Sequence, residues 1–161
     1  MNYPHYSQSQ FLLNSESKIM KILKHLVLAS LLAACAAKAD VTITDAWVRA
    51  NAPGQKVGAA YMTLTSPQDS TLVFAETPAA GTVEIHSMSM EDGVMKMRML
   101  EELPLKAGKP EKLAPGGFHL MLFDLKKPLI AGEKVTFRLC FKDKANKITD
   151  QTITLPIKEA N

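Results

Sequence analysis

Two histidines and two methionines in the second half of the chain have the types and spacing of a metal site. Ten residues separate His86 from Met97, twenty-one separate Met97 from His119, and one separates His119 from Met121. Imidazole binds several transition metals, whereas the polarizable, uncharged thioether favours a soft ion over Mg²⁺ or Ca²⁺. Zinc sites are built from Cys, His and carboxylate ligands rather than thioethers. The four side chains therefore predict a Cu(I) site with two imidazole and two thioether ligands.

The element that would position two of these residues is a β-hairpin. Asp92-Gly93 is a strong signal for a tight two-residue turn between strands. Three pairs of side chains then lie opposite each other on one face of the hairpin: His86 with Met99, Met88 with Met97, and Met90 with Met95. His86 and Met97 become diagonal neighbours, within reach of one ion.

His119 and Met121 lie in a third segment, in which apolar residues alternate with possible ligands. Phe118, Leu120 and Leu122 should face the core together, because side chains alternate across a strand. His119 and Met121 then point the other way. We expect this pair to face the hairpin.

A packing role is the alternative for the same residues. Methionine fills irregular cores and adaptable binding surfaces, and most lone histidines are not ligands. The chain has four histidines, of which His5 and His25 lie in a segment that we expect to be removed, so both remaining histidines fall in the Met-rich stretch. Further methionines there fit either auxiliary ligands or a soft docking rim: Met88, Met90, Met95 and Met99. From the residues alone, both interpretations stay open.

The spacing resembles that of the periplasmic copper chaperone family called PCu(A)C. The family pattern is a histidine, ten residues, a methionine, twenty-one residues and His-x-Met, which this chain matches through His86, Met97, His119 and Met121. Similar sequence surrounds these positions, at residues 46–50, 58–63, 90–98 and 115–122. The resemblance covers nearly all of the chain after about residue 40.

The resemblance implies a function, a fold and partners. It implies a Cu(I) carrier with those four ligands on a cupredoxin-like or immunoglobulin-like β-sandwich. The implied acceptor is the binuclear copper centre of cytochrome c oxidase, in its subunit II, or an oxidase assembly factor. Some family members carry a second copper site in a His/Met-rich C-terminal extension, but residues 157–161 contain neither His nor Met.

Residues 1–39 have the pattern of an export leader. Met20 opens a basic run, and residues 26–37 form an apolar stretch rich in Leu and Ala. That stretch is too short for a transmembrane helix, which needs about 20 apolar residues. Translation starting at Met20 is an alternative to starting at Met1.

The processing site has two interpretations. Cleavage after Ala39, at Ala-Lys-Ala, would release residues 40–161 into the periplasm. A lipoprotein box ending at Cys35 would instead tether the same domain to a membrane through a lipid. Both place the domain outside the cytoplasm.

Charge and cysteine content limit the function classes. Removing the leader's four lysines and one glutamate from 19 basic and 16 acidic residues leaves 15 of each, so residues 40–161 offer no charge argument for nucleic acid or anionic lipid. Cys140 is the only thiol in that range and can form no intramolecular disulfide. We expect it to be structural filler.

From residue 40 onward the chain predicts a single all-β domain. Short β-rich segments alternate with Gly- and Pro-containing turns, which is typical of a sandwich or barrel. Strands are expected at 41–49, 57–65, 71–75, the two hairpin arms, 118–123, 134–141 and 148–156. Residues 103–115 contain three prolines and should be mostly loop, with one short extended piece.

The residue sets on which enzymes and electron carriers usually depend are not visible in the sequence. No Ser/His/Asp set and no Cys-x-x-Cys pair is visible, and Cys140 is not followed by the histidine of a blue-copper loop. We therefore predict an extracytoplasmic Cu(I) chaperone rather than an enzyme. Its affinity should fall below about pH 6.5, because imidazole must lose its proton to bind. A Met-rich docking module and a copper-sequestering tolerance protein are the alternatives.

Overall fold

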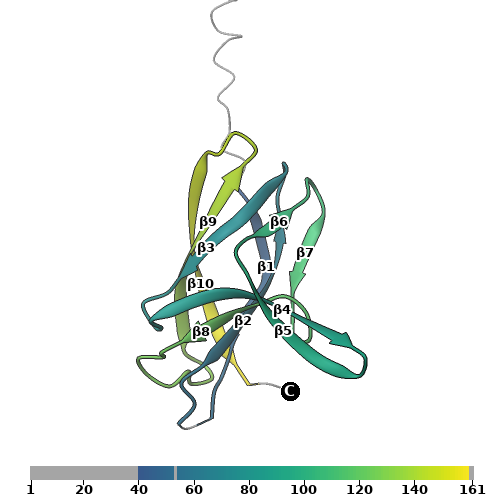
Figure 1. Ribbon diagram of the computed structural model, residues 1–161. Helices are drawn as coiled ribbons and strands as arrows, with labels where there is room; N and C mark the ends of the chain where they lie inside the picture. The colour runs from purple at the N-terminus through teal and green to yellow at the C-terminus, as the bar shows by residue number, and fades with distance from the viewer. Residues whose placement is uncertain (1–39, 53, 160–161) are drawn as a thin grey trace, which may run out of the picture. The chain divides into compact units, whose positions relative to one another are not determined.

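The structure, a computed structural model, describes residues 40–52 and 54–159 (Figure 1). The predicted leader, the start at Met20 and the lipidation of Cys35 fall outside these residues. None of the described residues belongs to a helix that could cross a membrane. All of the described strands lie in one compact unit, residues 39–161.

The described residues form an all-β fold, as predicted. Its strands are β1 (Thr42–Arg49), β2 (Gly58–Thr65), β3 (Ser70–Glu76), β4 (Thr82–Glu91), β5 (Val94–Leu100), β6 (Leu103–Leu105), β7 (Pro110–Leu113), β8 (His119–Phe123), β9 (Lys134–Asp143) and β10 (Ile148–Lys158). The segment 103–115 holds two short strands rather than the single piece expected. Both find partners far away in sequence, because β6 pairs with β3 and β7 pairs with β2.

The strands follow one path, in the order β5-β4-β8-β2-β1-β10-β9-β3-β6, with β7 beside β2. A short parallel contact between β1 and β10, at Val48 with Ile157, joins the two halves of this path. Both halves contribute to one apolar core, from Val48 and Leu64 in the first half to Phe137 and Leu139 in the second. The predicted sandwich is confirmed.

The hairpin of β4 and β5 extends beyond the other strands, at the lower right of Figure 1. Its turn residues Asp92 and Gly93 both have positive φ, 53° and 76°, as a type I′ turn requires. The predicted register is confirmed: His86 pairs with Met99, Met88 with Met97, and Met90 with Met95. β5 is an edge strand, and β4 pairs with β8 only as far as His86. Beyond His86 the hairpin therefore has no third strand.

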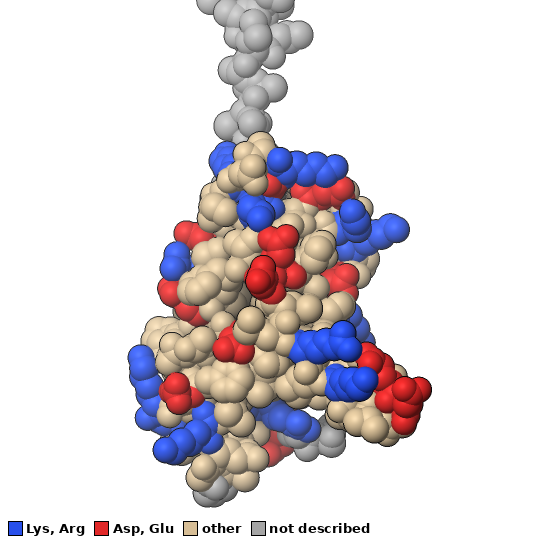
Figure 2. Space-filling view, viewed as in Figure 1, with Lys and Arg blue, Asp and Glu red and all other residues tan. Residues whose placement is uncertain are grey.

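The face of β4 that carries Ile85 changes from apolar to polar where the strand extends beyond the core. Ile85 is buried, but the next residues on that face are Ser87, Ser89 and Glu91. No core lies beneath them, so polar side chains are suitable there. Figure 2 shows acidic and basic side chains interspersed over the visible surface, with both signs at the hairpin tip.

Cys140 lies on β9, in the half of the fold that lacks the histidines. Its side chain is 6% exposed. Burial and a hydrogen bond with Asp150 raise the pKa of the thiol to about 11. The thiol is therefore protonated at neutral pH, whereas metal binding and nucleophilic chemistry need the thiolate.

Candidate metal centre

β8 places the two histidines side by side. It lies between β4 and β2, and the register of β4 and β8 pairs His86 directly with His119. Their ring centroids are 5.9 Å apart, and the ring planes are inclined by 46°. Residues paired directly across two strands share one face of the sheet. Two imidazoles from different strands therefore meet on this face.

Alternation along β8 is as predicted from the sequence. Leu120 and Leu122 are fully buried in the core, and Phe118 packs against it. His119 and Met121 occupy the opposite face. They lie there with the hairpin residue His86, as expected.

The two histidines are buried although they lie outside the main core. His119 is 3% exposed and His86 is 9% exposed. Aromatic side chains surround them: the Tyr61 ring lies 6.5 Å from His119, and the Phe123 ring lies 5.9 Å from His86. Trp47 extends this group through Tyr61, at 4.7 Å. An apolar shell of this kind limits the access of water to a metal site.

His119 is oriented by a hydrogen bond from one of its ring nitrogens. Its Nδ1 lies 3.0 Å from the carbonyl oxygen of Gly117. A carbonyl only accepts, so Nδ1 carries the proton and donates it. In the neutral ring the lone pair is then on Nε2. Metal-binding histidines are typically oriented by a hydrogen bond of this kind.

His86 has the opposite arrangement of its two nitrogens. Its Nε2 lies 2.8 Å from Glu84 Oε2, and a carboxylate can only accept, so Nε2 donates. The lone pair is then on Nδ1. Nδ1 of His86 is also the one buried side-chain nitrogen or oxygen in the described part of the chain without a hydrogen-bond partner. Leaving such an atom unpaired costs about 1–3 kcal/mol. A metal ion would satisfy it.

The two predicted thioether ligands differ in their surroundings. Met121 is half-buried, on the same face as His119 and directly paired with Glu84. Met97 is 47% exposed and pairs with Met88. On this face of the hairpin, that pair is next to the pair of His86 and Met99. Met97 is thus a diagonal neighbour of His86, as the sequence predicted. The register places three of the four residues together on β4 and β8, and the fourth on the exposed edge strand.

The described residues offer no competing site for a harder metal. Among residues 40–52 and 54–159, no three His, Cys, Asp or Glu side chains come together as a metal would require. Cys140 is on β9, away from the histidine pair in the strand order. Met121, on the same face, is a thioether that would extend this imidazole pair into a ligand set of soft character.

Sequence reasoning missed several residues of this centre. Glu84 was detectable, because it lies two positions before His86 and must share its face. Phe123 follows Met121 in the same way. Gly117 and Tyr61 gave no local signal, because their contacts with His119 depend on the fold of the 115–118 turn and on the place of β2 beside β8.

Comparison with known proteins gives the family. A sequence model for LpqE-like proteins, described as candidate lipoproteins, matches residues 41–157. The chain belongs to the LpqE-like family. This span contains both histidines and both methionines of the candidate centre. Lxx21020 of Leifsonia xyli subsp. xyli, which is named as a candidate lipoprotein, is 30% identical to this chain over 120 residues, 74% of this chain and 70% of that protein.

Solved structures share the fold of this LpqE-like chain. The apo PCuAC domain from PmoF1 has a TM-score of 0.60 and 25% identity, over 75% of this chain and 98% of that domain. DR1885 from Deinococcus radiodurans, whose structure is named as its Cu(I) form, has a TM-score of 0.55 and 32% identity, over 77% of this chain and 83% of that protein. The resemblance to the PCu(A)C family is thereby supported, and residues 39–161 of this chain form one compact unit.

Proposed function

We propose that this LpqE-like protein is an extracytoplasmic Cu(I) chaperone. It would hold the ion between His86 and His119 and pass it to an acceptor protein. The observation that carries the proposal is the buried Nδ1 of His86, which lacks a hydrogen-bond partner beside a second buried imidazole. The similarity to DR1885, whose structure is named as a Cu(I) form, supports copper as the ion.

Four neutral ligands make up the proposed set. Nδ1 of His86 and Nε2 of His119 supply two nitrogen lone pairs, and Met97 and Met121 supply two sulfur atoms. Thioether ligands select Cu(I) among the common biological metals. Glu84 and Gly117 act indirectly, because each accepts a hydrogen bond from one histidine and so fixes which nitrogen faces the ion.

The arrangement suits transfer as well as binding. The histidines are buried and hydrogen-bonded, whereas Met97 is 47% exposed on the edge strand. An incoming ligand of the acceptor can therefore replace Met97 first, while both imidazoles still hold the ion. The ion then leaves by stepwise ligand exchange, without passing through water as a free cation.

The proposed location and acceptor come from relatives and from the family resemblance. The lipoprotein descriptions of the LpqE-like family and of Lxx21020 support an exported or lipid-anchored protein. The resemblance to PCu(A)C proteins supports cytochrome c oxidase subunit II, or an oxidase assembly factor, as the acceptor. A sequestering role would use the same centre and differ only in having no acceptor.

A protein-docking module is the second candidate, because several methionines of the hairpin are exposed. Met90, Met95, Met97 and Met99 have between 47% and 65% of their surface exposed. Docking through these side chains would not depend on the buried histidines. Loss of His119 therefore separates the two functions.

The test is a Cu(I) competition titration of residues 40–161 against a coloured chelator, without oxygen and under reducing conditions. The chaperone proposal predicts one tightly bound equivalent that is lost in His119→Gln. This substitution keeps a side chain of similar length but removes the imidazole. Tight binding that survives His119→Gln, or no competition by the wild type, would refute the proposal.

A further inference from the structure

The outer part of the β4–β5 hairpin carries more thioethers than the proposed copper centre uses. Beyond His86, the outward face of the hairpin presents Met88 and Met90 on β4, and Met95 and Met97 on β5. Of these, only Met97 belongs to the four-ligand set. Met88, Met90 and Met95 are therefore left without a role.

These three methionines are not explained by packing. Met90 and Met95 pair directly across the strands and are 65% and 59% exposed. Met88 is half-buried and diagonal to Met95. β-Branched residues have a higher strand propensity than unbranched side chains at exposed positions. What methionine adds over them is a soft sulfur donor.

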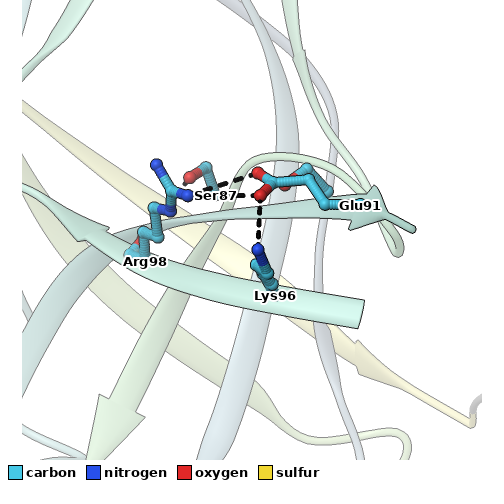
Figure 3. A network of polar contacts seen from close by, with 5 residues as sticks. Ser87, Glu91, Lys96 and Arg98 are labelled. Atoms are coloured by element: carbon cyan, nitrogen blue, oxygen red, sulfur yellow. Dashed lines mark hydrogen bonds and ion pairs between the residues drawn. The ribbon is translucent and has the colours of Figure 1, made fainter. Parts of the chain in front are cut away.

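The opposite face of the hairpin fixes this arrangement. Glu91 accepts hydrogen bonds from Lys96 at 2.8 Å and from Arg98 at 3.3 Å (Figure 3). It also accepts one from Ser89 at 3.1 Å. These contacts join β4 to β5 just before the turn. Two-stranded hairpins are marginally stable alone, so the ionic network and the type I′ turn together hold the register. The thioethers on the other face are thereby kept in fixed pairs.

The geometry brings three sulfur donors within reach of one ion. Directly opposed residues have Cβ atoms about 4.5–5.5 Å apart, and diagonal neighbours remain within reach of long side chains. Met90 and Met95 are directly opposed, and Met88 is a diagonal neighbour of Met95. The donors are neutral, soft and open to solvent, and no carboxylate or imidazole points from the same face of the tip.

We infer that Met88, Met90 and Met95 form a second Cu(I) site at the tip of the hairpin, separate from the histidine centre. The inference rests on the proposed function only for the identity of the ion. The tip site lacks imidazole ligands and is more exposed, so it binds Cu(I) more weakly. Met97 lies between the two sites, which makes the tip a position where Cu(I) can arrive before it reaches the histidines.

The inference is tested by following methionine methyl groups in residues 40–161 during titration with Cu(I) alone, without oxygen. NMR of ¹³C-methyl-labelled methionine resolves the sites. The first equivalent should shift Met97 and Met121, and the second should shift Met88, Met90 and Met95. Met62 is 1% exposed in the core and provides an internal control that should not move.

Substitution at the tip provides the second arm of the test. The double variant Met90→Leu with Met95→Leu should lose the second equivalent and keep the first. Val94→Leu is the matched control, because Val94 is 59% exposed in the same hairpin but carries no sulfur. It should keep both equivalents.

The outcomes separate this inference from the proposed function. Failure of the second equivalent to shift the three tip methyls, or its survival in the double leucine variant, would overturn the tip site. If the tip methyls respond while the methyl group of Met121 does not, the tip site stands and the chaperone centre fails.

Discussion

The two ends of the β4–β5 hairpin place their possible metal ligands in opposite environments. At the base, His86 is 9% exposed, is paired with β8, and lies among aromatic rings. At the tip, Met90 is 65% exposed and has only β5 beside it. The base has buried side chains held by hydrogen bonds, and the tip has thioethers that are exposed to solvent. In the proposed function, the base would therefore set the affinity for Cu(I), and the tip would set how fast Cu(I) is gained and lost.

The largest expected effect comes from removing an imidazole at the base. His119→Ala should weaken Cu(I) binding by more than the about 10- to 100-fold that is typical of losing an indirect partner. Competition titration measures the change. His119→Gln, which leaves a smaller void, should behave in the same way, and thermal unfolding should show that both variants fold. If both variants retain wild-type affinity, the base is not the binding site.

The next effect comes from the carboxylate that orients His86. Glu84→Ala removes the acceptor 2.8 Å from Nε2, so the ring can turn and Nδ1 is no longer aimed at the ion. Affinity should fall by about 10- to 100-fold. Glu76→Ala is the control, because Glu76 lies on β3, away from the histidines in the strand order, and pairs with Arg138. Equal effects of the two substitutions would argue against an orienting role for Glu84.

Met97→Leu tests the role of the exposed thioether of the proposed centre. Leucine is close to methionine in volume, and Met97 is 47% exposed, so the fold should be unaffected. We expect affinity to fall by less than in Glu84→Ala, with faster loss of Cu(I) to a chelator in stopped-flow experiments. Met62→Leu, in the core, should change neither affinity nor rate. Slower release in Met97→Leu would contradict the proposed order of ligand exchange.

The smallest effect concerns Cys140, a buried soft donor far from the histidines in the strand order. Cys140→Ala should leave Cu(I) affinity unchanged. The pKa of the thiol is raised from 9.0 to about 11, so above pH 9 the unfolded chain loses this proton more readily than the folded one. Wild-type stability should therefore fall relative to Cys140→Ala as the pH rises from 9 to 11. Denaturant unfolding at several pH values measures this, and a constant difference would exclude the linkage.

Local signals in the sequence predicted the hairpin well. Asp92 and Gly93 favour a turn with two positive φ angles, and a two-residue turn leaves one register for the flanking strands. Alternation then assigned His86, Met88 and Met90 to one face of the first strand. The same rule separated His119 from Leu120 on β8.

Contacts between strands that are distant in sequence were not predictable in the same way. β8 lies between β4 and β2, which directly pairs His86 with His119, but no local pattern specifies that neighbour order. The hydrogen bond from His119 to Gly117 depends on the backbone of a turn. Residues 103–115 look like loop because of their prolines, yet their strands form by pairing with β2 and β3.

The central claim is that Cu(I) lies between Nδ1 of His86 and Nε2 of His119. The most direct measurement is ¹⁵N NMR of the imidazole nitrogens in residues 40–161, before and after one equivalent of Cu(I). The account predicts that these two nitrogens shift, while Nε2 of His86 and Nδ1 of His119 keep their protons. Unchanged imidazole nitrogens with Cu(I) bound would place the ion elsewhere and contradict the account.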